Sequence, residues 1–197
     1  QLLPGGDFES AAVWLPMALR CGLISQLDEL AVATALAEIA KDGVERGVNL
    51  SPASLQDIQF VHRLHARLLA APEAARHLWL EVAEMAALDN FAMVRELCKQ
   101  VKALGVRVGL EHAGERLTRI EFLFEAGLDY VKLDASVVHG VASDSARRAF
   151  VAGSVTMLHS LGLAVYAEGV HDLEDLQALW PCGLNGVTGP AVRFNAP

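Results

Sequence analysis

Short apolar runs alternate with longer amphipathic stretches along most of the chain, and this alternation is the feature that most constrains its fold. The runs are apolar on both faces, as buried strands of a parallel sheet are, and they span residues 47–50, 78–82, 106–111, 130–133, 163–167 and 186–188. Between them, apolar residues follow helical spacing in residues 55–68, 94–104 and 154–161. The pattern predicts an α/β fold with a parallel sheet and right-handed crossovers.

Polar residues stand at or just past the C-terminal end of most of these runs. They are Asn49, Glu81, Glu111, Lys132 with Asp134, and Glu168. In a barrel these ends converge on one mouth, where such proteins keep their chemistry, whereas an open sheet would spread them along a line. We therefore favour a (β/α)8-type, TIM-like barrel over an open doubly wound sheet. Because only six runs are visible, we expect residues 1–197 to form a single barrel domain whose first strand or strands lie upstream of Gln1.

Composition narrows the class of protein. The 197 residues are 53% hydrophobic and 20% charged, which is ordinary for a folded globule, and no apolar run approaches the roughly 20 residues of a membrane-spanning helix. A net charge of −8 disfavours a nucleic acid polymer as partner but allows a small anion held by local donors. Cys21, Cys98 and Cys182 are widely spaced and fit reduced thiols in the cytosol.

The polar strand ends lie in recognisable local motifs. These are Val48-Asn49-Leu50-Ser51, Leu80-Glu81-Val82-Ala83-Glu84, Lys132-Leu133-Asp134 and Ala167-Glu168-Gly169-Val170, preceded by Gly22-Leu23-Ile24 and Leu27-Asp28. In this order and spacing the series resembles the EAL domain family, whose active members hydrolyse cyclic di-GMP. The resemblance runs from about Trp14 to Pro190, nearly the whole chain.

The resemblance implies a role for each matching residue. In the family, the residues that match Asn49, Glu81 and Glu168 help to hold two divalent metals, and the residue that matches Lys132 assists the attacking water. Glu84 matches a glutamate that steadies the loop after a metal-binding Asp pair. Two such metals would activate water and stabilise the leaving oxygen of a phosphodiester.

The chain departs from the family where this chemistry would occur. Glu111-His112 replaces the Asp pair: the extra methylene displaces the carboxylate of Glu111, and the nitrogen of His112 suits Mg²⁺ poorly. Thr188-Gly189-Pro190 replaces the family's QGY, and its metal-binding ExL strand is not part of this sequence. We therefore expect no catalytic residue, no hydrolysis and no bound Mg²⁺ or Mn²⁺.

These particular replacements resemble the degenerate EAL domains of LapD-type membrane receptors. Such receptors carry HAMP and GGDEF segments, bind cyclic di-GMP without cutting it, and relay the signal to a periplasmic output. The resemblance implies a cytoplasmic module of an inner-membrane regulator of biofilm formation or adhesion. It also allows GGDEF or HAMP segments in the full-length protein and a homodimer through the barrel.

The predicted ligand contacts combine the strand-end residues with two less regular segments. They are Asn49, Glu81, Lys132, Asp134, Glu168, Thr188, Gly189 and Pro190, with Arg116 as a stacking platform. Arg116 is included because Ala113 and Leu117 stand where the family offers aromatics to a guanine, and base stacking is worth roughly 1–3 kcal/mol. A guanidinium plane stacks on bases and also binds phosphate.

Two alternatives remain open. In the first, Glu111 and His112 still hold one cation and the chain is a residual metal-dependent phosphodiesterase. In the second, which the loss of loop aromatics favours, the chain is a ligand-free interaction or dimerisation module. A further structural interpretation makes Lys132 and Asp134 an ion pair at a strand end.

Overall fold

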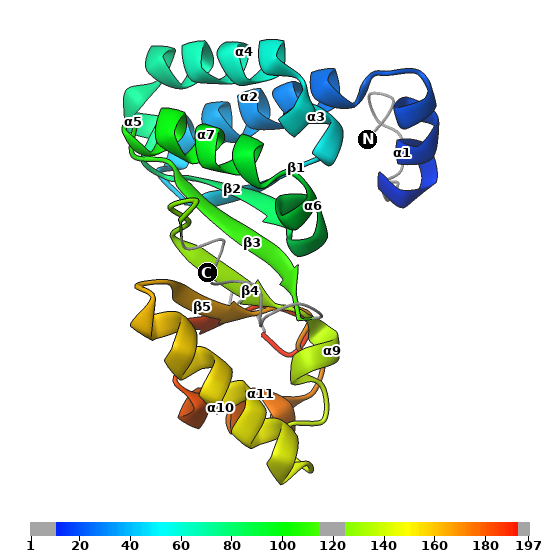
Figure 1. Cartoon of the computed structure of the whole chain (residues 1–197), viewed down its shortest axis with the longest axis vertical. Helices are drawn as coiled ribbons and strands as arrows, with labels where there is room; N and C mark the ends of the chain where they lie inside the picture. Colours follow the sequence, from blue (N-terminus) through cyan, green and yellow to red (C-terminus); the bar gives the residue numbers. More distant parts are fainter. Residues whose placement is uncertain (1–10, 115–124, 193–197) are drawn as a thin grey trace.

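Six parallel strands form one curved sheet in chain order (Figure 1) in the computed structural model, which describes residues 11–114 and 125–192. The strands are β1 (Arg46–Leu50), β2 (Leu78–Ala83), β3 (Arg107–Ala113), β4 (Tyr130–Leu133), β5 (Ala164–Ala167) and β6 (Gly186–Val187). Each predicted strand is confirmed to within two residues of its bounds. Within the described residues, β1 and β6 are the edges of the sheet, and the architecture is the predicted TIM-like α/β type.

Helices connect the strands and cover the outer face of the sheet. They are α1 (Ala11–Arg20), α2 (Ile24–Asp42), α3 (Pro52–Gln56), α4 (Ile58–Ala70), α5 (Pro72–Ala75), α6 (Glu84–Asp89), α7 (Phe91–Lys102), α9 (Ala135–Val138), α10 (Ser145–Ser160) and α11 (Leu173–Leu179), followed by the 3-10 turn η2 (Trp180–Cys182). Figure 1 shows α2, α4 and α7 over the β1–β3 end of the sheet, and α10 and α11 over the β5–β6 end. No helix in the described part of the chain has both the length and the apolar character to cross a membrane.

The helix expected over residues 55–68 is two helices. Asp57 interrupts it with an extended backbone, φ −90° and ψ 99°, and its carboxylate accepts a hydrogen bond from the backbone N–H of Gln59. That bond caps the new helix α4. Because the interruption is a single residue, the spacing of apolar residues hardly changes, and periodicity alone did not reveal the break.

Alternation along each strand separates a packed outer face from a polar and aromatic inner face. On β2, Leu78, Leu80 and Val82 are fully buried towards the helices. The intervening positions carry Trp79 and Glu81, which face the concave side of the sheet. The same alternation recurs on β3, β4 and β5, so the outer core is a continuous cluster of Val, Leu and Ala side chains.

Three aromatic rings fill the concave side of the sheet below the strand ends. Trp79 lies with its ring centroid 4.7 Å from that of Tyr130 and 5.6 Å from that of Tyr166. Gly109 makes room for this cluster, because a Cβ there would lie 2.4 Å from the Tyr130 ring. The guanidinium carbon of Arg107 lies 4.7 Å from the Trp79 ring centroid. The cluster forms an apolar floor beneath the polar strand ends.

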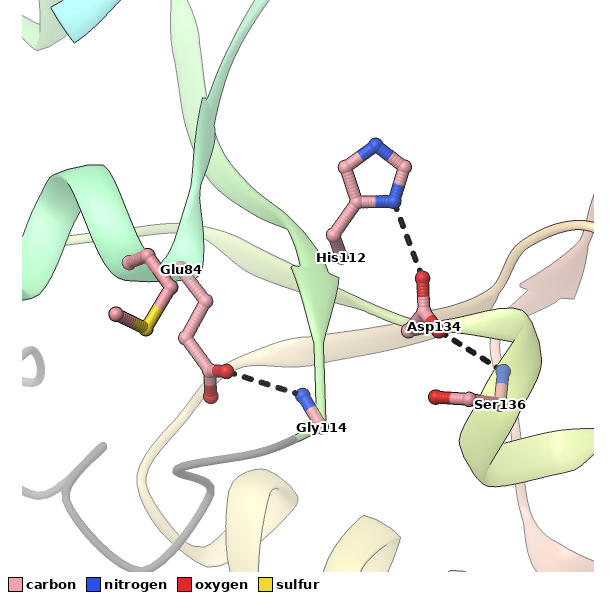
Figure 2. A pocket seen from close by; sticks show the side chains of 6 residues that line it. Glu84, His112, Gly114, Asp134 and Ser136 are labelled. Atoms are coloured by element: carbon pink, nitrogen blue, oxygen red, sulfur yellow. Dashed lines mark hydrogen bonds and ion pairs between the residues drawn. The ribbon is translucent and has the colours of Figure 1, made fainter.

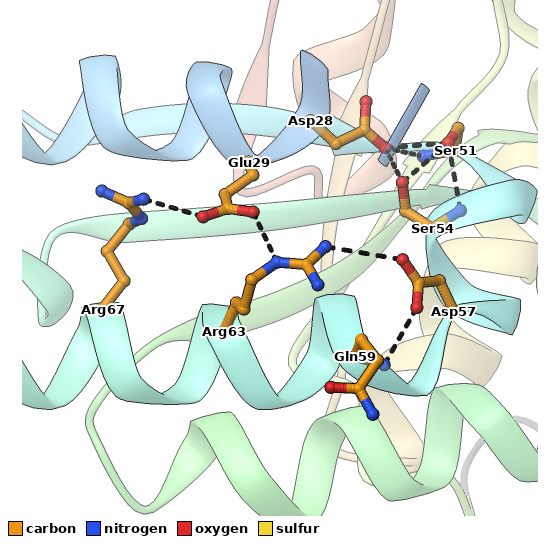
Figure 3. Close-up of polar contacts among 8 residues, drawn as sticks. All are labelled: Asp28, Glu29, Ser51, Ser54, Asp57, Gln59, Arg63 and Arg67. Atoms are coloured by element: carbon orange, nitrogen blue, oxygen red, sulfur yellow. Dashed lines mark hydrogen bonds and ion pairs between the residues drawn. The ribbon is translucent and has the colours of Figure 1, made fainter. Parts of the chain in front are cut away.

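A polar network fixes the segment that follows Asn49 (Figure 3). One carboxylate oxygen of Asp28, on α2, accepts hydrogen bonds from the backbone N–H of Ser51 at 2.8 Å, its hydroxyl at 2.8 Å and the hydroxyl of Ser54 at 2.7 Å. The neighbouring Glu29 pairs with Arg63 and Arg67 of α4. The Asp28 position singled out in the sequence therefore joins α2 to the turn after β1.

Candidate functional site

The parallel register brings the polar strand-end residues to one edge of the sheet, here called the mouth. Asn49 on β1 is in register with Glu81 on β2, and Glu111 on β3 is in register with Ala83 at the end of β2. Lys132 on β4 is in register with Tyr166 on β5, two residues before Glu168. Asn49 is exposed at the mouth, whereas Glu81 is 5% exposed.

Lys132 is held by Glu81 at the base of the mouth. Its ammonium contacts one carboxylate oxygen of Glu81, and the hydroxyl of Tyr130 donates to the same oxygen at 3.2 Å. Gly47 leaves space for this carboxylate, because a Cβ there would lie 2.8 Å from it. Burial, together with the negative charge of Glu81, raises the pKa of Tyr130, which keeps its hydroxyl a donor. The interpretation of Lys132 as the ion-pair partner of Asp134 is wrong, because Lys132 pairs with Glu81.

A β-bulge near the end of β3 brings His112 into the mouth beside Glu111. The register with β4 shifts between Leu110 and Ala113, and His112 has a φ of 53°, which few residues other than glycine adopt. In a regular strand two adjacent side chains would face opposite sides of the sheet. The bulge removes that alternation, as bulges beside functional sites commonly do.

The imidazole of His112 is surrounded by three carboxylates. Its Nδ1 lies 2.5 Å from Oε1 of Glu168 and 3.2 Å from Oδ2 of Asp134, and its Nε2 lies 3.9 Å from Oε2 of Glu111. The backbone N–H of His112 also donates to the same oxygen of Glu168, at 3.0 Å. Asp134 and Glu168, two of the predicted contacts, therefore meet through a residue that the sequence did not place among them.

The environment of the mouth shifts the pKa values of these groups. Burial raises the pKa of Glu111 and of Glu168. Burial alone would lower the pKa of His112, but the charges of Glu168 and Glu111 and the hydrogen bond with Asp134 outweigh it and raise that pKa. Hydrogen bonds from Ser136 hold the pKa of Asp134 below its usual range, against a smaller opposing effect of burial.

A pocket of about 230 Å³ opens beside the His112 ring (Figure 2). Its lining is Glu84, Met85, His112, Gly114, Asp134 and Ser136. The carboxylate of Glu84 accepts a hydrogen bond from the backbone N–H of Gly114 at 3.3 Å, at the point where the chain leaves β3. Asp134 caps α9 by accepting from the backbone N–H of Ser136 at 2.9 Å. The pocket therefore lies between the start of the loop after β3, which Glu84 holds, and the start of α9, which Asp134 caps.

The remaining predicted contacts have mixed positions. Thr188 is exposed, and its hydroxyl donates to the carbonyl of Ala167 at 3.4 Å. Gly189 has a φ of 137° and packs so closely that a Cβ would lie 2.3 Å from the backbone nitrogen of Val170. Pro190 is exposed in the same turn, which braces the strand end carrying Glu168. Arg116 and Leu117 lie outside the described residues.

Among the residues that the structure describes, two groups of side chains have the composition of a cation site. In the mouth, His112, Asp134 and Glu168 place ligand atoms within 4.8 Å of one another. Away from the mouth, His139, Asp172 and Asp175 do the same. The carboxylate of Asp175 already accepts hydrogen bonds from the backbone N–H groups of Gly140 and Ala142, at 2.7 and 2.9 Å, so its structural task is to hold a loop.

Sequence reasoning missed the role of Tyr130 and the contacts of His112, which it considered only as a possible cation ligand beside Glu111. A signal for Tyr130 was present, because it precedes Lys132 by two residues on one strand and must share its face. No comparable signal existed for His112, whose orientation depends on the bulge. Strand alternation places it on the opposite face from Glu111.

Comparison with known proteins gives the family. The EAL domain model matches residues 2–193. Among curated relatives, the bifunctional diguanylate cyclase/cyclic di-GMP phosphodiesterase MucR of Pseudomonas aeruginosa is 27% identical over 183 residues, which is 89% of this chain and 27% of MucR. The chain spans about a quarter of the length of the first such relatives.

Solved structures agree on the fold. The FimX EAL domain from Pseudomonas aeruginosa bound to c-di-GMP superposes with a TM-score of 0.89 at 22% identity, covering 98% of this chain and 79% of that one. The S helix-GGDEF-EAL portion of Vibrio cholerae LapD superposes with a TM-score of 0.85 at 18% identity, covering 95% and 47%. With the family model matching almost all of its residues, the chain belongs to the EAL domain family.

Proposed function

We propose that the mouth binds cyclic di-GMP as a signalling receptor and does not hydrolyse it. The contacts are Asn49, Glu81, Lys132, Asp134, Glu168 and the turn of Thr188, Gly189 and Pro190, with Arg116 as a stacking platform. The observation that carries the proposal is that one mouth holds an ammonium and several carboxylates side by side, each fixed by its own neighbours.

Such a mixture matches the chemistry of a cyclic dinucleotide. Its two phosphodiesters are anionic and require cationic or N–H donors, which Lys132 supplies. Its guanine edges carry N–H donors, for which Asp134 and Glu168 are acceptors. A purely acidic mouth would repel the phosphates, and a purely basic one would not distinguish guanine.

Relatives support this choice of ligand. The FimX EAL domain, similar over nearly the whole of this chain, was solved with c-di-GMP bound. MucR, 27% identical, is a cyclic di-GMP phosphodiesterase, and its solved complex contains c-di-GMP. More than one structural relative of this chain has therefore been solved with c-di-GMP bound.

The chemistry of the donor set argues against hydrolysis. Two hard cations need several free carboxylate oxygens in a defined arrangement. Here one oxygen of Glu81 is bonded to Lys132 and Tyr130, and one oxygen of Glu168 is bonded to His112. Glu111-His112 offers one carboxylate where the family has two. We derive no catalytic step through a metal.

One observation favours a rival function. His112, Asp134 and Glu168 converge closely enough to bind a single cation, so a residual metal-dependent phosphodiesterase is the second candidate. The full-length context is also part of the proposal: we propose a cytoplasmic receptor module of an inner-membrane protein, dimeric through the barrel, in which a GGDEF segment precedes the EAL domain as it does in the LapD relative.

Calorimetric titration with cyclic di-GMP, in Mg²⁺ and separately in chelator, tests the proposal. We expect binding in both buffers. Glu168→Ala removes an acceptor at the mouth, and we expect the affinity to fall by about tenfold or more, the scale of one charged hydrogen bond. Glu174→Ala is the matched control, because it makes the same change at an exposed position of α11.

Each contrary result has a distinct meaning. Unchanged affinity with lowered stability in Glu168→Ala would make Glu168 only a structural partner of His112. Absence of binding by the unmodified chain would reject the receptor, leaving the ligand-free interaction module. Binding lost in chelator would favour the metal-dependent rival.

A further inference from the structure

We infer that His112 replaces a divalent cation in the mouth: its ring holds Glu168 and Asp134 together and keeps them from taking up a metal. His112 is thus a positioning residue whose contacts make nucleotide recognition independent of metal. The inference concerns the same mouth as the proposed function, but it rests on the ring's own contacts and its test requires no nucleotide.

The first support is the direction of the contacts around the ring. Three carboxylates from three different strand ends point at one imidazole, with Glu168 and Asp134 both approaching Nδ1. Acidic side chains arranged around a single central group are the usual setting of a bound cation. Here the centre of the arrangement is a side chain of the protein itself.

The second support is that Glu168 is engaged twice by the same residue. One oxygen of Glu168 accepts from the backbone N–H of His112 at 3.0 Å and lies 2.5 Å from its Nδ1. Glu168 is largely buried, with 15% of its side chain exposed, so a competing metal would have to displace both contacts in a poorly hydrated setting. The His112 side chain itself is 60% exposed, so the contact lies at the solvent side of Glu168.

The third support is that Glu81, elsewhere in the mouth, is also paired with a nitrogen donor of this chain. Glu81 directs one carboxylate oxygen at the Lys132 ammonium, as Glu168 directs one at His112. Both of the glutamates that match metal-binding positions of the family are therefore paired with nitrogen donors of this chain. The donor set does not fit two hard divalent cations.

The opposite hypothesis uses the same atoms. His112, Asp134 and Glu168 could instead serve as a nitrogen and two oxygen ligands of one transition metal, since their ligand atoms lie within 4.8 Å. Substitution separates the two hypotheses, because removing the ring frees the carboxylates in one and destroys the site in the other.

The experiment is a titration of the chain with Mn²⁺ alone, followed by the EPR signal of the free ion, and a parallel calorimetric titration with Zn²⁺. The variants are His112→Asn and His112→Asp. After glycine, Asn and Asp are among the residues that tolerate the positive φ at this position best. His62→Asp, at an exposed site on α4, makes the same substitution away from the mouth. Circular dichroism verifies that each variant is folded.

We expect both variants at position 112 to bind Mn²⁺ at least about tenfold more tightly than the unmodified chain or His62→Asp, with His112→Asp the tighter. The inference is overturned if the unmodified chain binds one equivalent of Mn²⁺ or Zn²⁺ and His112→Asn loses it. It is equally overturned if folded His112→Asp binds Mn²⁺ no better than His62→Asp. Neither result depends on whether cyclic di-GMP binds.

Discussion

Replacing Asp28 by alanine should destabilise the chain through the turn after β1. One oxygen of Asp28 accepts three hydrogen bonds, from the backbone N–H and hydroxyl of Ser51 and from the hydroxyl of Ser54, which is fully buried. Bonds to a charged acceptor are worth about 1.5–3 kcal/mol, and stranding buried donors costs about 1–3 kcal/mol. Since the two hydroxyls lie 3.1 Å apart and can still bond to each other, we expect a loss of about 2–4 kcal/mol in the free energy of unfolding.

Urea denaturation followed by circular dichroism measures this loss. Asp42→Ala is the matched control, because Asp42 also accepts hydrogen bonds, from Arg46 and from the backbone N–H of Val44. It lies at the exposed end of α2, so we expect a far smaller loss of stability. The midpoint of Asp28→Ala should fall while the slope of the transition stays the same. If Asp28→Ala loses no more stability than Asp42→Ala, the network does not hold the turn, and another reason must be sought for the acid at this position.

Three further predictions concern the mouth. No linear product should form from cyclic di-GMP at any Mg²⁺ or Mn²⁺ concentration; chromatography that detects product above a metal-free control would contradict this. The dissociation constant of cyclic di-GMP should be the same in chelator and in Mg²⁺ by calorimetry, since Lys132 and N–H donors bind the phosphates. The pKa of His112 is raised in the fold, so its stabilising contribution is fully present below the ordinary value of 6.5 and is lost as the pH rises through the folded value. In urea titrations, the free energy of unfolding of the unmodified chain should therefore exceed that of His112→Asn by less in mildly alkaline buffer than in mildly acidic buffer. A difference that does not change with pH would refute this prediction.

The strands could be predicted because their buried outer faces and the aromatic cluster on the inner face make each run mostly apolar, although Glu81 and Lys132 face the mouth. Runs such as residues 78–82 therefore stood out from the amphipathic helices on either side. Dependence on the spacing of apolar residues also explains why one helix was expected over residues 55–68 where there are two. The break consists of Asp57 alone, which is both the extended residue and the cap of α4, so the spacing of apolar residues is almost undisturbed.

The mouth could be predicted in its location but not in its pairing. Parallel strands put all their C-terminal ends at one edge, so Glu81, Lys132 and Glu168 had to be neighbours. Which carboxylate takes which cation depends on distances between strands, and these follow from the register and the inner-face packing. Lys132 met Glu81 rather than Asp134, because Asp134 turns away to cap α9 and contact His112.

The bulge at the end of β3 explains why a single side chain can decide the character of the mouth. The backbone there is held by contacts that do not involve the His112 ring: the N–H of Asp134 donates to the carbonyl of Ala113 at 2.9 Å, and that of Gly114 donates to Glu84. We therefore expect the bulge to keep position 112 beside Glu168 and Asp134 when His112 is replaced by Asn or Asp. An acidic side chain at that point would add a ligand for a cation, whereas imidazole supplies a donor to the acids already present. Under the proposed function, position 112 thus sets whether the acids that follow β4 and β5 are paired with a nitrogen donor of the chain or are available to a cation.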